Sequence, residues 1–147
     1  MRRLRIAVPL AAALLLVVPA ANAAAPGTYK GWLYSVTSGK RYRDSRTTVT
    51  VTGDRLSLKA SNLRLECPDR DDDGDAVRKK ASVGWRGNIE SNRVDGTAKE
   101  DDGASRLRLT GRFSGTRFTG RLSMRGAPGV TEACEGSARV RATLPRR

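Results

Sequence analysis

The sequence contains no histidine, and this absence removes the side chain most often used as a catalytic base or metal ligand. Triads that depend on histidine and metal sites made of imidazoles are therefore excluded. The sequence also lacks a G-x-S-x-G elbow, an S-x-x-K box and a phosphate-binding glycine loop. Its acids leave a glycosidase-like pair of carboxylates open, but most of them lie in two stretches typical of exposed loops. We therefore predict that the protein is not an enzyme.

Cysteine is almost absent too, with only Cys67 and Cys134 in the chain. No C-x-x-C redox motif exists, and an intermolecular bridge or a metal site would need further ligands that the sequence does not supply. Two cysteines allow a single pairing within the chain. We predict one disulfide, formed in an oxidising compartment.

The compartment is indicated by the first 23 residues, which combine three arginines, an apolar stretch and the small-residue sequence Ala21-Asn22-Ala23. This pattern is typical of a secretory signal peptide, and the apolar stretch is short for a membrane span. We predict a signal peptide at residues 1–23 and one secreted domain at residues 24–147, extracellular or in the cell envelope. The mature chain has no predicted transmembrane segment, and no cysteine directly follows the apolar stretch to carry a lipid anchor.

Large apolar residues are scarce in the mature chain, where Leu, Ile, Val and Phe together number 20 of 124. Such a composition approaches that of disordered chains, but these residues recur at two-residue spacing, which is typical of half-buried strands. About nine short strands are predicted, at 29–36, 48–52, 56–58, 63–65, 81–85, 94–98, 107–113, 118–124 and 134–144. The predicted fold is all-β, a single antiparallel up-and-down barrel or a β-sandwich with one disulfide.

Acids are outnumbered, since the mature chain has 25 basic and 15 acidic residues and a net charge of +10. Arginines alternate with apolar residues in the segment 106–125, and alternate residues of a strand share one face of the sheet. This spacing predicts a surface that attracts anionic envelope polymers or lipid headgroups, although a merely solvated outer face is the plainer interpretation. We expect no nucleic-acid partner. The candidate binding residues are Arg108, Arg112, Arg117 and Arg121.

One acidic segment resembles the start of a calcium loop, with acids at its first, third and fifth positions and Gly74 at the sixth. Where the loop of the EF-hand family has its bidentate glutamate, this chain has Lys80. Two interpretations remain open. The segment either binds calcium, which is the sole candidate cofactor, or forms a solvated turn between two strands. The candidate ligands are Asp69, Asp71, Asp73 and Asp75.

The segment Gly111 to Leu122, the later Cys134-Glu135-Gly136 and the Gly27 to Gly31 start resemble small secreted all-β proteins of actinobacteria. This largely uncharacterised group implies a fold type and secretion but no activity. From the residues we predict a basic, non-enzymatic binding or envelope-associated module. The alternatives are a β-barrel carrier of a small apolar ligand and a secreted inhibitor that presents the loop from Gly126 to Ala133.

Overall fold

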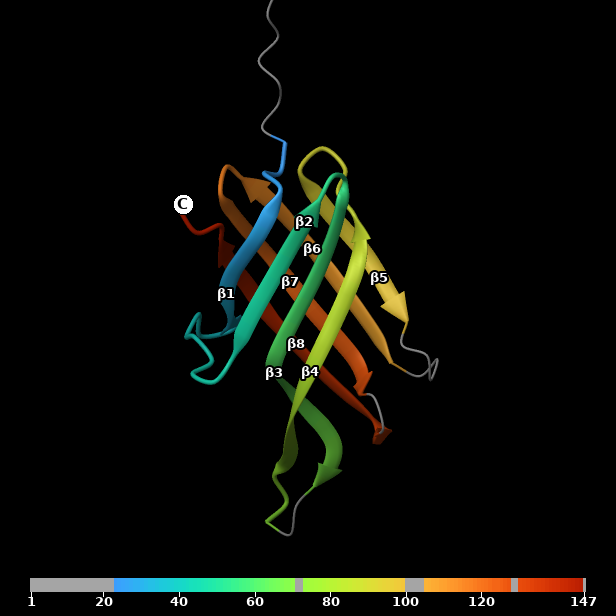
Figure 1. The fold of residues 1–147 in the computed structure, drawn as a ribbon. Helices are drawn as coiled ribbons and strands as arrows, with labels where there is room; N and C mark the ends of the chain where they lie inside the picture. Colours follow the sequence, from blue (N-terminus) through green and yellow to red (C-terminus); the bar gives the residue numbers. More distant parts are fainter. Residues whose placement is uncertain (1–22, 71–72, 100–104, 128–129, 147) are drawn as a thin grey trace, which may run out of the picture.

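The computed structural model describes residues 23–70, 73–99, 105–127 and 130–146, and within these ranges the regular structure is entirely β (Figure 1). Eight antiparallel strands follow one another along the chain. They are β1 (Gly27–Ser35), β2 (Arg46–Thr52), β3 (Arg55–Arg70), β4 (Ala76–Asn88), β5 (Arg93–Lys99), β6 (Arg106–Ser114), β7 (Arg117–Ala127) and β8 (Val130–Thr143).

The strands form one barrel-like sheet in the order β4-β3-β2-β1-β8-β7-β6-β5. Strands that follow one another in the sequence pair, except β4 and β5. The first strand also pairs with the last, from Lys30 opposite Thr143 to Ser35 opposite Ala138. Figure 1 shows β1 to β4 in front and β5 to β8 behind them. Between β4 and β5 the described residues form no ladder, so the sheet has one seam there.

The predicted all-β fold is confirmed, with eight strands where about nine were expected, because the runs around Leu58 and Leu65 belong to a single strand, β3. A bulge lies between them, where the pairing with β4 shifts and Asn62 takes a φ of 58°. Asparagine tolerates this left-handed conformation, and its side-chain amide donates to the carbonyl of Asp44 at 2.7 Å. The extra residue keeps Leu63 facing the core, as Leu58 does.

The interior is filled by one cluster of buried apolar side chains from both halves of the sheet. At its centre the rings of Tyr29 and Phe118 both pack against Phe113, with centroid distances of 5.4 and 4.8 Å. Gly111 and Gly120 lie opposite each other beside these rings, and a Cβ on Gly111 would come within 2.6 Å of Phe118 Cζ. The absence of a side chain at these two glycines makes room for an aromatic ring in the core.

The seam between β4 and β5 is covered from inside by the indole of Trp85, which is 3% exposed. A Cβ on Gly96 of β5 would lie 2.8 Å from its Cζ2 atom, so the ring reaches across to the neighbouring strand. Packing by one side chain replaces hydrogen bonds there, and the indole Nε1 has no partner among the described residues.

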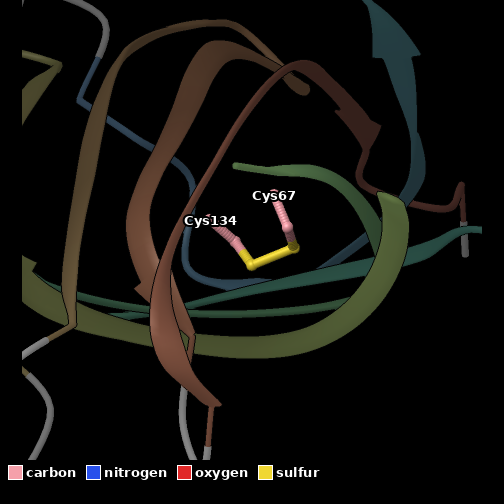
Figure 2. The surroundings of a disulfide bond; sticks show 2 residues. All are labelled: Cys67 and Cys134. Atoms are coloured by element: carbon pink, nitrogen blue, oxygen red, sulfur yellow. A yellow bond between two sulfur atoms is a disulfide. The ribbon is translucent and has the colours of Figure 1, made fainter. Parts of the chain in front are cut away.

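The predicted disulfide between Cys67 and Cys134 is confirmed, with the two Cα atoms 4.0 Å apart (Figure 2). Near its end β3 pairs a second time, with Glu66 opposite Glu135 of β8, and the same register places the two cysteines opposite each other. Gly136 permits this approach, since a Cβ there would lie 2.3 Å from the carbonyl oxygen of Arg64. The bond therefore fastens the far end of β3 to β8.

Candidate anion-binding site

The outer face of strands β5 to β8 is rich in arginine. Core residues such as Leu107, Leu109 and Leu122 are buried, and the alternating arginines on the opposite face are exposed. The predicted binding residues Arg108, Arg112, Arg117 and Arg121 all lie on this face, together with Arg106 and Arg125. The surroundings of these six arginines differ along the face, as described below, so the six do not form a single site.

Positive charge is not confined to this face. The sequences of β5 to β8 contain ten basic and three acidic residues, and those of β1 to β4 contain ten basic and two acidic residues. The whole barrel therefore attracts anions, and a local site must be distinguished by how its cations are arranged.

A hollow of about 490 Å³ lies in the middle of this face, over β6 and β7. Its floor includes the backbone of Gly111 and Gly120, and the hydroxyl-bearing residues Thr110 and Thr119 stand beside them. Four arginines from four successive strands surround it: Arg93, Arg112, Arg121 and Arg139. We call this feature the arginine hollow.

The four arginines form two cross-strand pairs. Arg93 of β5 lies directly opposite Arg112 of β6, and Arg121 of β7 lies directly opposite Arg139 of β8. Side chains in such positions have Cβ atoms about 5 Å apart. Within the described ranges, none of the four makes an ion pair with a carboxylate.

Other arginines on the same face do have acidic partners. Arg108 holds both carboxylate oxygens of Asp95, at 3.1 and 3.2 Å, and Nε of Arg125 lies 2.8 Å from Glu135. Arg108 is therefore the predicted binding residue least available to a ligand. Arg117 lies at the turn between β6 and β7, about four residues along the strand from Arg121 and outside the hollow.

Sequence reasoning missed Arg93 and Arg139. Arg139 stands in the alternating run of the last predicted strand, between Ala138 and Val140, so its outward orientation was readable. Its position opposite Arg121 depends on the register between β7 and β8, and alternation alone does not determine register.

An aromatic strip on β1 borders the face on the side of β8. Tyr34 lies opposite Arg139, and the guanidinium of Arg141 sits 4.7 Å from the Tyr34 ring centre. Trp32 is 37% exposed, and Arg41 lies 5.2 Å from the centre of its ring. These cation–π contacts hold Arg141 and Arg41 against the aromatic side chains of β1.

A second, larger groove of about 660 Å³ lies beside the disulfide, between the connection from β1 to β2 and the outer face of β3, β7 and β8. Here the charges are mixed. Glu66 and Glu135 face each other, and Arg64 is stacked 4.5 Å from the centre of the Tyr42 ring. Because its cations are interspersed with acids, this groove is a weaker anion site than the arginine hollow.

The candidate calcium ligands lie only in part within the described residues. Asp71 falls outside them, and for Asp69 only the backbone is described, at the end of β3. Asp73 and Asp75 are exposed. Over the ranges that the structure describes, no three metal-ligating side chains come together, and the calcium hypothesis stays a prediction.

Among the residues that the structure describes, one titratable group has a clearly shifted pKa, and it lies in the core. Burial raises the pKa of Tyr29 above its ordinary value of 10.0, and the hydroxyl donates to the carbonyl of Ala25 at 2.8 Å. This tyrosine contributes to stability and does not touch the arginine hollow.

Comparison with known proteins adds no assignment, because the chain matches no protein family, no curated protein and no solved structure. The resemblance to small secreted proteins of actinobacteria therefore rests on the glycine spacings alone. In the described ranges the chain forms no helix with the length and apolar character needed to cross a membrane.

Proposed function

We propose that this protein is an exported, non-enzymatic binding module that attaches to anionic polymers or lipid headgroups of the cell envelope through the outer face of β5 to β8. The observation that carries the proposal is the arginine hollow, where four arginines make no ion pair with a carboxylate of the described chain. Unneutralised cations gathered on one surface attract polyanions and speed their association. Export is supported by the sequence at residues 1–23 and by a disulfide, which persists in oxidising compartments.

The non-enzymatic part of the proposal rests on the chemistry of the available side chains. Histidine is missing from the sequence, and Glu66 and Glu135 are exposed carboxylates surrounded by arginines. General acid–base catalysis by an imidazole is therefore not open to this chain.

The two alternative functions receive less support. A carrier of an apolar ligand needs interior space, and the interior between the two halves is occupied by core side chains. An inhibitor needs a protruding loop, but Ala127 and Val130 pair with each other, so most of the segment 126–133 belongs to β7 and β8.

The proposal is tested by sedimentation of the mature protein with vesicles that contain phosphatidylglycerol. Reversing Arg112, Arg121 and Arg139 to glutamate should weaken binding more than reversing Arg43, Arg55 and Arg86, which are exposed and lie outside the face. The binding of the native protein should fall steeply as salt rises from 0.01 to 0.15 M, because the Debye length shrinks from about 30 to about 8 Å. Equal losses from both triple variants would contradict a role for this face and leave net charge alone.

A further inference from the structure

We propose that the arginine hollow is a specific site for ligands with two or more phosphate groups, such as inorganic oligophosphates or clustered terminal phosphomonoesters. The inference rests on the proposed function and narrows it from anions in general to one chemical class. It concerns the geometry of four guanidinium groups, in addition to their charge.

The first argument comes from like charges in direct opposition. Residues directly opposite on one face interact strongly, and two cations in this position destabilise the sheet. One such pair elsewhere in the barrel is relieved: Arg64 faces Lys80, but Arg64 stacks on Tyr42 and Lys80 lies 3.4 Å from Asp44. Lys99 and Arg106 form a further opposed pair, at the outer end of β5 and β6. Around the arginine hollow neither pair makes an ion pair with a carboxylate of the described chain. Glu90 lies opposite Arg93 in the hairpin but does not bond to its guanidinium, whereas Arg121 and Arg139 have Thr110 and Tyr34 opposite them on their other sides. A bound anion would therefore supply neutralisation, most of all at Arg121 and Arg139.

The second argument concerns stoichiometry. A carboxylate carries one negative charge and two oxygens, which a single arginine satisfies with its two parallel N–H donors. A terminal phosphate carries about −1.5 to −2 charges and three acceptor oxygens near neutral pH. A cross-strand pair such as Arg121 and Arg139 offers two positive charges and two donor forks, and so matches one phosphate.

The third argument is the separation of the two pairs. The midpoint between Arg93 and Arg112 lies two strand spacings and two residues along the strand from the midpoint between Arg121 and Arg139. At about 4.8 Å per strand and 3.3 Å per residue, the backbone midpoints are about 12 Å apart. All four side chains line the hollow between the two pairs, and Thr110 and Thr119 add hydroxyl groups there. This arrangement fits a chain of phosphates better than a single small anion.

The test measures binding of sodium tripolyphosphate by titration calorimetry at 0.15 M NaCl, with citrate as a carboxylate anion of comparable charge. The key variant is Arg121→Lys with Arg139→Lys, which preserves every charge and removes one pair of donor forks. We expect tripolyphosphate to bind at least tenfold more tightly than citrate, and the double variant to lose about tenfold in affinity. The matched control, Arg43→Lys with Arg55→Lys, should change affinity less than twofold.

Two vesicle compositions identify the source of the phosphate. Stronger binding to phosphatidic acid than to phosphatidylglycerol at equal surface charge, lost in the double lysine variant, would assign the site to lipid monoester headgroups. Tripolyphosphate binding without that lipid preference would assign it to free oligophosphate.

The inference would be overturned if the double lysine variant, with the melting temperature of the native protein, bound tripolyphosphate as tightly as the native protein does. It would also be overturned if the native protein bound citrate as tightly as tripolyphosphate. If the double lysine variant still sediments with phosphatidylglycerol vesicles in that case, the proposed function survives without the phosphate specificity. Because lysine conserves the charge, loss of vesicle binding by glutamate variants tests the proposed function separately.

Discussion

Removing the disulfide should cost this barrel a large part of its stability. The bond closes a loop of 67 residues, and it lies where β3 leaves β2 and pairs with β8 instead. The perturbation is reduction of the native protein, and the replacement of Cys67 and Cys134 by alanine gives a permanent form of the same change.

The magnitude follows from loop closure in the unfolded chain. For a loop of this length the chain-entropy relation gives about 4 kcal/mol at 25 °C. Small domains have free energies of unfolding of about 5–15 kcal/mol, so the loss would remove a quarter or more of the total. Both sulfur atoms are buried in the core, with Cys67 4% and Cys134 0% exposed, and the alanine variant should therefore lose slightly more than the reduced protein.

Urea unfolding followed by tryptophan fluorescence measures this loss, with and without a reducing agent. Thiol titration of the native protein in denaturant should find no free thiol, and a reducing agent should leave the stability of the alanine variant unchanged. A difference below about 1 kcal/mol between oxidised and reduced protein would refute the loop-closure argument, because it would mean that the unfolded chain gains little freedom when the link is cut.

Three further outcomes follow from the core and the loops. Gly111→Ala should destabilise the protein by about 1–3 kcal/mol, because its Cβ meets a buried aromatic ring, whereas Gly84→Ala, with its nearest atom at 3.9 Å, should be close to neutral in the same urea assay. Because the pKa of Tyr29 is raised, the folded state holds the phenol proton more tightly than the unfolded state does. The stability that this proton contributes is complete below pH 10.0 and is lost as pH rises through the folded pKa. The stability of Tyr29→Phe should therefore fall less steeply with pH than that of the native protein in thermal melts at alkaline pH. If Asp73 and Asp75 contribute to a calcium site, millimolar calcium should raise the melting temperature and their replacement by asparagine should abolish the rise; no shift up to several millimolar would contradict the site.

Much of this fold was predictable from alternation and turn residues. Ser91 and Asn92 stand between the predicted strands 81–85 and 94–98, and they form a tight hairpin turn with φ values of 49° and 65°. The bulge at Asn62 could not be predicted, because the pair Ser61-Asn62 is equally typical of a turn and of an irregularity within one strand. The buried leucines change from even to odd positions between Leu58 and Leu63, and this change alone distinguishes a bulge from a turn. It becomes informative only once both runs are known to face the same core.

The sequence allowed us to predict which face of the sheet carries the candidate site, but not which residues form it. Arginine spacing indicated which side of the strands carries charge, and Arg112 and Arg121 are part of the arginine hollow as expected. The pairing of Arg121 with Arg139, and the neutralisation of Arg108 by Asp95, depend on which residues of separate strands lie opposite each other. Register arises from packing of the whole sheet, so the sequence of one strand does not contain it.

The seam between β4 and β5 has a consequence for how the chain can be cut and rejoined. It falls in the middle of the sequence, while the two ends meet in the middle of the sheet, where Gly27 lies beside Leu144 and β1 pairs with β8. Opening the chain at the exposed hairpin tip of Ser91 and Asn92 would leave two four-stranded fragments, still fastened by a complete strand ladder and by the bond from Cys67 to Cys134. The barrel is therefore suited to circular permutation, and to reassembly from two halves, without breaking any pairing within the sheet except at that tip.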